Sequence, residues 1–337
     1  MSFGGIALLL LGLGLLGQVA ISAYCLYGNV GRKILSWSAS PLNTALACLH
    51  HGLYTRRPGR GMMGVESKDL PSGPQRPRKR QPSMRKPCDA TYNIVYLLFF
   101  LAFLTIVLAV TIYTLCVHLD RVQYYSFFSD GAPGGDHEVA TTGIRVGIQT
   151  SYVLLPQFLV FLFGLAMQSI ITFALHCAEL VVNVSRDERS WRAAAKPAGT
   201  TLGDGAVKSA RTSLAWLFLF VLKPILQWLF GAQGISYSNN QGGSIEFNPI
   251  PLFVLAGVAT LLAVFATCLV CRQQRGPQPA AYGHLQTMVD CIDDWGQGDT
   301  GRLWWGYKGL GADRVGVVGT SGIQGAVWPV SFERTYQ

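Results

Sequence analysis

The sequence predicts an all-α membrane protein with five transmembrane helices, a cytosolic basic loop and a mostly irregular cytosolic C-terminal tail. Half of the 337 residues are hydrophobic and only 13% are charged, whereas a soluble domain usually carries about 25% charged residues. The apolar residues are concentrated in five long runs, as in multi-pass membrane proteins. The formal net charge of +9 arises within one stretch between the first two runs. It therefore does not indicate a positively charged surface of the whole protein that would bind nucleic acid.

Each of the five apolar runs is long enough for a helix to cross a bilayer, which needs roughly 20 residues. They cover residues 6–27, 94–117, 152–184, 213–230 and 249–271. The first run could instead be a cleaved signal peptide. No basic residue precedes it, and Arg32 and Lys33 follow it, which favours an uncleaved span with its N-terminus outside. The third run must tilt or extend past the bilayer.

The runs divide the chain into four parts. These are the first span, the basic loop, a four-span membrane region and the tail, at residues 1–27, 28–93, 94–271 and 272–337. The loop is rich in Pro and Gly and poor in large aliphatic residues, so we expect it to be largely disordered. One short helix is expected inside it, beginning at Ser40-Pro41 and running to about Leu53.

The basic residues between the runs predict the orientation. The loop after the first span contains twelve of them and the loop after the third contains six, whereas the loops after the second and fourth contain two and none. Because basic loops stay on the cytosolic side, the N-terminus is expected outside and the C-terminus in the cytosol, in the plasma membrane or an endomembrane. None of the eight cysteines falls in a predicted outside loop, which excludes a disulfide-built ectodomain.

Three ionisable residues inside the spans are candidate functional residues, because such groups are costly in a bilayer. They are Lys223, in the middle of the fourth run, and His176 and Glu179, one helical turn apart in the third. Lys223 could pair with Glu179 inside the bundle, but counting helical rise places Glu179 about 10 Å nearer the inner interface than Lys223, which argues against direct pairing. In the alternative interpretation Lys223 snorkels and Glu179 reaches the inner headgroups.

Two further groups of residues point to lipid. Cys268 and Cys271 lie at the inner end of the fifth run and are lipidation candidates; their CxxC spacing lacks the second pair that a structural zinc site needs. The polybasic loop carries a cluster expected to contact anionic lipids of the inner leaflet. Its members are Arg76, Arg78, Lys79, Arg80, Arg85 and Lys86.

The tail combines an apolar helical pattern at residues 285–292 with a Gly-rich aromatic segment that contains Trp295, Trp304 and Trp305. Such segments favour short strands or turns, with exposed aromatic anchors for a protein interface or for the inner membrane face. The runs HLQTMVDCIDDW, LWWGYKG (WWG-x-K) and Gly319-Thr320-Ser321, together with WSASPLNTALACLHHGL near the start of the loop, resemble a group of uncharacterised multi-pass membrane proteins of filamentous fungi. The resemblance implies a membrane location and a fungal source, and no activity.

The patterns of nucleophilic, metal-dependent and nucleotide-dependent enzymes, such as GxSxG, HExxH and GxxxxGK[ST], do not occur in the sequence. We therefore expect no catalytic residue, cofactor or metal site, and enzymatic activity is disfavoured without being excluded. The expected function is that of an interaction or scaffold protein that binds an unknown cytosolic partner through its cytosolic segments. The alternative is a small-solute or ion transporter built on Lys223, Glu179 and His176.

Overall fold

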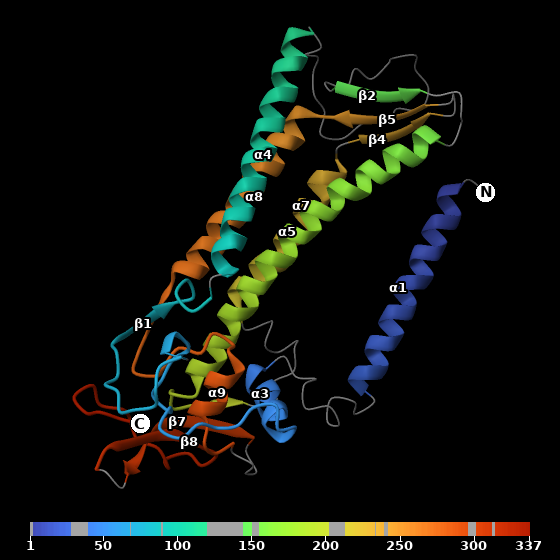
Figure 1. The fold of residues 1–337 in the computed structure, drawn as a ribbon. Coiled ribbons are helices and arrows are strands. Elements are labelled where there is room, and N and C mark those ends of the chain that lie inside the picture. Colours follow the sequence, from blue (N-terminus) through green and yellow to red (C-terminus); the bar gives the residue numbers. More distant parts are fainter. Residues whose placement is uncertain are drawn as a thin grey trace. The chain divides into compact units, whose positions relative to one another are not determined.

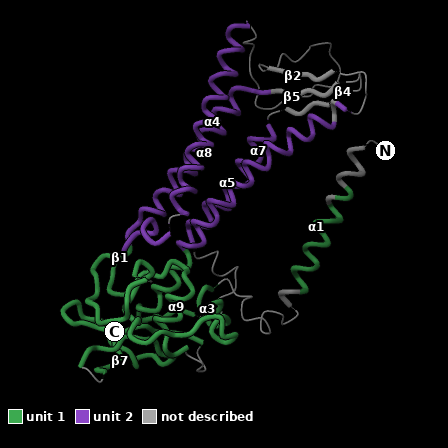
Figure 2. The backbone as a smooth tube through the Cα atoms, viewed as in Figure 1, with its two compact units in different colours: residues 1–81, 186–212, 274–337 green, residues 82–185, 213–273 purple. Residues whose placement is uncertain are grey.

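The computed structural model of the chain is mostly helical and divides into two compact units (Figures 1 and 2). Unit 1 comprises Met1–Gln81, Arg186–Thr212 and Gln274–Gln337, and unit 2 comprises Pro82–Ser185 and Ser213–Gln273. The structure describes residues 3–27, 40–67, 69–88, 90–119, 144–149, 155–201, 213–232, 234–238, 242–295, 301–311 and 314–337. The first part of the predicted basic loop, residues 28–39, lies outside these ranges.

Unit 2 is built on four long helices. They are α4 (Ala90–His118), α5 (Leu155–Ala193), α7 (Leu214–Gly231) and α8 (Pro249–Cys271). All four are long and apolar enough to cross a membrane, which agrees with four of the predicted spans and indicates a membrane location. α5 has 39 residues, more than a bilayer requires, and its residues from Arg186 onward belong to unit 1. The helix that contains the third apolar run thus extends well beyond membrane-spanning length.

The first apolar run forms α1 (Phe3–Tyr27), a helix of 25 residues. Over its described residues, α1 is not among the helices that are long and apolar enough to cross a membrane. The fifth span therefore stays a prediction.

Small side chains allow two of the unit 2 helices to pack closely. α4 and α8 lie side by side (Figure 1), with Ala102 and Ala109 on α4 and Ala256 and Ala263 on α8 at most 3% exposed. Small residues of this kind bring helix backbones together in membranes, where burial from water does not drive association. Large apolar side chains on the other faces, such as Phe103, remain exposed, as expected for surfaces that contact lipid.

A three-stranded antiparallel sheet joins the two loops predicted to lie outside. Its order is β2 (Ile144–Gln149), β5 (Gly242–Phe247) and β4 (Gly234–Ser238). β2 comes from the loop after the second predicted span, and β4 and β5 come from the loop after the fourth. The expectation of an all-α fold is therefore too narrow, although helices dominate. The pairing also requires both loops to lie on one side of the membrane.

Unit 1 folds from three separate segments of the chain. Its elements are α3 (Pro41–His50), the short 3₁₀ helix η2 (Val65–Ser67), α9 (Leu285–Cys291) and an antiparallel sheet ordered β3 (Thr200–Thr201), β7 (Arg302–Leu310), β8 (Gly316–Ser321). β1 (Arg80–Ser83) and β6 (Gln273–Arg275) form a further two-stranded sheet. α3 begins at Pro41 after Ser40, as the sequence predicts.

The core of unit 1 shows why the expectation of disorder is wrong for residues 40–67 and 69–81. Leu42 of the basic loop, Trp191 of α5 and Met288, Leu303 and Tyr336 of the tail are all at most 1% exposed and belong to one apolar cluster. The loop contributes few large apolar side chains of its own. It is ordered because the end of α5 and the tail supply most of the apolar area that offsets its ordering entropy.

Candidate functional site

The ionisable residues of the membrane region meet between α5 and α7. The Lys223 Nζ atom donates to Glu179 Oε2 at 2.7 Å, and His176 Nδ1 lies 3.4 Å from the same oxygen. The expectation that Lys223 and Glu179 do not pair is therefore wrong. Helical rise compares only the positions of the two Cα atoms along the helix axes. The long, flexible side chains of Lys and Glu can reach each other across a difference in these positions.

Amide and hydroxyl groups continue this contact along the same two helices. Gln168 Nε2 donates to Gln227 Oε1, and Gln227 Nε2 donates to Thr172 Oγ1 at 3.4 Å. Gln168, Thr172 and Glu179 fall on one face of α5 by their spacing of four and seven residues. The polar groups thus form a ladder between the helices, in which the lysine charge is compensated by a carboxylate. This arrangement suits a contact that holds α5 and α7 together.

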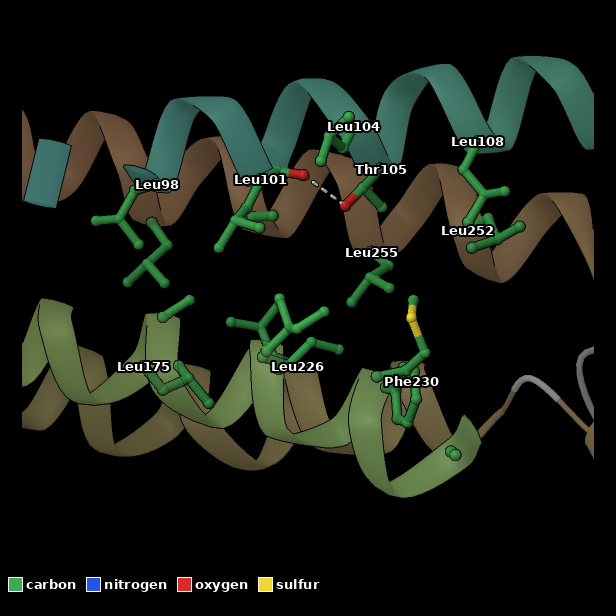
Figure 3. A pocket seen from close by; sticks show the side chains of 18 of the residues that line it. Leu98, Leu101, Leu104, Thr105, Leu108, Leu175, Leu226, Phe230, Leu252 and Leu255 are labelled. Carbon is green, nitrogen blue, oxygen red and sulfur yellow. Dashed lines mark hydrogen bonds between the residues drawn. The ribbon is translucent and has the colours of Figure 1, made fainter. Parts of the chain in front are cut away.

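An apolar cavity lies between the α4–α8 pair and the α5–α7 pair (Figure 3). Its volume is about 500 Å³, and leucines from all four helices point into it, among them Leu101, Leu175, Leu226 and Leu255. Apolar walls of this kind are compatible with an apolar occupant and offer little to a polar one.

In unit 1, the three tail motifs converge on Asp293. Lys308 of the WWG-x-K motif donates from Nζ to Asp293 Oδ2 at 2.9 Å and to the Thr320 carbonyl at 3.0 Å. The Thr320 amide donates to Asp293 Oδ1 at 2.6 Å. A Cβ atom on Gly319 would lie 2.3 Å from the same oxygen, so only glycine fits there. The motifs therefore form one structural junction.

The environment of Asp293 changes its acidity. Burial raises the pKa of its carboxyl group, but the hydrogen bonds from Lys308 and the Thr320 amide and the nearby positive charge outweigh burial, so the pKa lies below its usual value. Asp293 is therefore ionised at neutral pH and holds β7 and β8 to the segment that follows α9.

A second junction ties the basic loop to α9. The Arg57 guanidinium contacts both carboxylate oxygens of Asp290, with Nη2 2.6 Å from Oδ2. The Asp290 side chain is only 3% exposed. Arg60 lies close by, with Nε 3.5 Å from Asp290 Oδ2, and donates to the carbonyls of Leu70 and Ser67. In the sequence these two arginines look like ordinary charges of a basic loop. In the structure they donate hydrogen bonds that hold the loop in place.

The end of α5 is fixed to the tail by buried polar contacts. The Glu188 carboxylate accepts from the amides of Ala281 and Tyr282 at 2.9 and 2.8 Å, and its other oxygen lies 2.7 Å from Arg192 Nε. The Trp191 indole donates to the Pro279 carbonyl at 2.8 Å. The contacts with Pro279, Ala281 and Tyr282 are not visible in the sequence, because their partners are about 90 residues apart along the chain.

The aromatic anchors of the tail divide into buried and exposed ones. Trp295, Trp304 and Trp305 are at most 9% exposed, so the expectation that they form exposed anchors is wrong. Trp328, which the sequence analysis did not single out, is 55% exposed, and Ile323 is 71% exposed. We refer to residues 322–329 as the Ile323 loop.

The Ile323 loop is attached to the β7–β8 sheet at its end. The Trp328 amide donates to the Tyr307 carbonyl at 2.9 Å, and the Tyr307 amide donates to the Trp328 carbonyl at 2.8 Å. Inside the loop, the Ala326 amide donates to the Ile323 carbonyl at 3.3 Å. The loop therefore presents two large apolar side chains from a hydrogen-bonded turn.

The remaining predicted residues are exposed. All six basic residues of the polybasic cluster lie on the surface, where Arg78 pairs with Glu66 and the Arg85 guanidinium lies 4.7 Å from the centre of the Tyr92 ring. Cys268 and Cys271 are free and exposed on α8. Within the described part of the chain, no group of three or more His, Cys, Asp or Glu side chains is placed to hold a metal ion.

The chain matches no protein-family model, no curated protein and no solved structure. Its resemblance to multi-pass proteins of filamentous fungi accordingly stays a prediction, and what can be inferred about its function comes from its own geometry.

Proposed function

We propose that this protein is an integral membrane interaction protein that recruits a cytosolic protein partner through the Ile323 loop of unit 1. The carrying observation is the exposure of Ile323 and Trp328 on a turn held by backbone hydrogen bonds. Trp is the side chain most enriched among the residues that dominate binding energy. A turn already fixed in its conformation loses little entropy when it binds, so these two side chains suit a protein interface.

The order of the segments supports a single module on one side of the membrane. Along the sequence, α4 and α5 separate the first segment of unit 1 from the second, and α7 and α8 separate the second segment from the third. Each of these two insertions contributes two membrane-length helices, so the chain returns to the same side of the membrane after each of them. The excess of basic residues in the first two segments favours the cytosolic side.

The polybasic cluster fits this placement. Its six basic side chains are exposed, and each contributes about 1 kcal/mol when it lies near an anionic leaflet. We propose that they contact anionic lipid headgroups while the Ile323 loop binds the partner.

The alternative of a small-solute or ion transporter has weaker support. It would rest on the Lys223–Glu179 pair, in which each charge neutralises the other and α5 is joined to α7. The cavity in the bundle is lined almost entirely by apolar side chains, whereas a path for a polar solute needs polar groups along it.

The proposal is tested by proximity labelling in cells of the source organism with the full-length protein. The variant Ile323→Ser/Trp328→Ala should lose a specific set of labelled cytosolic proteins while keeping its abundance and membrane location. The matched control is Leu53→Ser, which removes an equally exposed apolar side chain from unit 1, since Leu53 and Ile323 are both 71% exposed.

The control variant should keep the wild-type set of labelled proteins. An unchanged set in Ile323→Ser/Trp328→Ala would refute docking through this loop. If instead the variant kept its labelled protein neighbours but lost its membrane location, the loop would be a membrane contact and the proposal would also fail.

A further inference from the structure

The walls of the cavity in unit 2 are almost entirely apolar. The side chains that line it are apolar except for Thr105, whose hydroxyl donates to the Leu101 carbonyl of its own helix at 2.8 Å (Figure 3). A polar ligand would therefore find no hydrogen-bonding side chain along this wall. Water is excluded for the same reason, because a water molecule needs two to four polar partners and apolar cavities stay dry.

The cavity is elongated along the helices. On α4 its lining runs from Leu98 to Leu108, and on α8 it runs from Leu252 to Leu262. Ten residues of helix correspond to about 15 Å, so the space is a channel parallel to the helix axes. A narrow apolar channel of this kind matches an extended hydrocarbon chain better than a compact ligand.

Its volume restricts the occupant. At about 500 Å³ it lies within the range of roughly 300–1,000 Å³ of pockets that enclose small ligands. A helix such as α1, with 25 residues, would be about 37 Å long and about 10 Å across, several times too large. Inside a bilayer, the most abundant molecules that are narrow, apolar and long enough are the lipids themselves.

We propose that this cavity binds one hydrocarbon chain of a membrane lipid. The chain would fill the space between the α4–α8 and α5–α7 pairs and become part of the core of unit 2. The site is independent of the Ile323 loop, and its occupant would contact all four helices of unit 2.

The experiment uses the full-length protein in vesicles that contain a photoactivatable acyl chain. One arm carries the diazirine on a phosphatidylcholine chain, and the other carries it on a free fatty acid, so the arms distinguish the source of the chain. After illumination, adducts are mapped by mass spectrometry. We expect adducts on the lining leucines Leu101, Leu226 and Leu255 in at least one arm, in addition to those on outward residues such as Phe103.

A matched pair of α8 variants sharpens the test. Ala259 lines the cavity, whereas Val264 is 45% exposed on the outside. Ala259→Phe should lower the adducts on the lining residues at least about tenfold, because its ring displaces two or more methylene groups of the chain. Val264→Phe should leave them unchanged.

Two results would overturn the site. In one, adducts of the wild-type protein occur only on outward-facing residues in both arms; this outcome does not depend on whether any variant folds. In the other, the lining residues crosslink equally in wild type and in folded Ala259→Phe.

Discussion

The Lys223 ammonium lies 2.7 Å from a carboxylate oxygen of Glu179 and joins two membrane-length helices, α7 and α5. Each side chain is about one-third exposed in the isolated chain, at 32% and 30%. In a bilayer that exposed part would face lipid or another helix, where an unpaired charge is costly. The pair is therefore best understood as a joint whose two halves depend on each other.

Lys223→Leu should lower the free energy of unfolding by about 3 kcal/mol, because it leaves the Glu179 carboxylate without its partner. The double variant Lys223→Leu/Glu179→Leu should recover most of the loss. His176→Leu is the control and should have little effect, since His176 is 67% exposed. Thermal unfolding of the purified protein in detergent measures all three. Additive losses in the double variant would contradict the joint.

Asp293 should make the stability of unit 1 sensitive to acid. Its pKa in the folded protein lies below the usual value, mainly because hydrogen bonds from Lys308 and Thr320 overcome the effect of burial. Its stabilising contribution is therefore complete above the unfolded pKa of about 3.9 and is lost as the pH falls through the lower folded pKa.

Asp293→Asn should lower the free energy of unfolding at pH 7 by about 1–3 kcal/mol and should reduce the further loss below about pH 4. Thermal unfolding between pH 7 and pH 3 checks both effects. Asp69→Asn makes the same change in charge at an exposed position and should behave as wild type. A pH profile of Asp293→Asn identical to that of wild type would be the contrary result.

Gly319 should not tolerate a side chain. Its Cβ would lie 2.3 Å from Asp293 Oδ1, so Gly319→Ala should destabilise the protein by about 1–3 kcal/mol, as overpacking does. Gly73→Ala is the control, because nothing lies within 4 Å of a Cβ there. Equal unfolding temperatures for the two variants would show that the junction around Asp293 is looser than described.

The sequence predicts the membrane part of this fold better than unit 1. Continuous apolar runs are a local signal, and four of them became helices of membrane-spanning length. The signal for the start of α3 is also local, because Ser40 and Pro41 by themselves favour the beginning of a helix at that position. The sequence does not predict that residues 40–67 and 69–81 are ordered, because their core partners, such as Trp191 and Met288, lie far away in the chain.

The candidate sites show the same limit. Lys223, Glu179 and His176 could be selected from the sequence as charges inside spans, but their contact could not be deduced from helical rise. The cavity was not predictable, since leucines that line it, such as Leu226, have the same sequence signature as leucines that face lipid. Trp304 and Trp328 look alike in the sequence, and only the fold shows that the first is buried and the second exposed.

The central claim is that three segments, separated by pairs of membrane helices, form one module on the cytosolic side. It is tested by single cysteines at Gly73, Ala195 and Gln324, one in each segment, and at Gly242 in β5. A membrane-impermeant maleimide is applied to intact and permeabilised cells, and labelling is compared with the parent protein.

Gly242→Cys should be labelled in intact cells, whereas Gly73→Cys, Ala195→Cys and Gln324→Cys should be labelled only after permeabilisation. If one of the three segment positions behaved differently from the other two, the three segments could not form a single module, and the account would be contradicted. If all three were labelled in intact cells while Gly242→Cys was spared, the module would lie outside, and a cytosolic partner would be refuted.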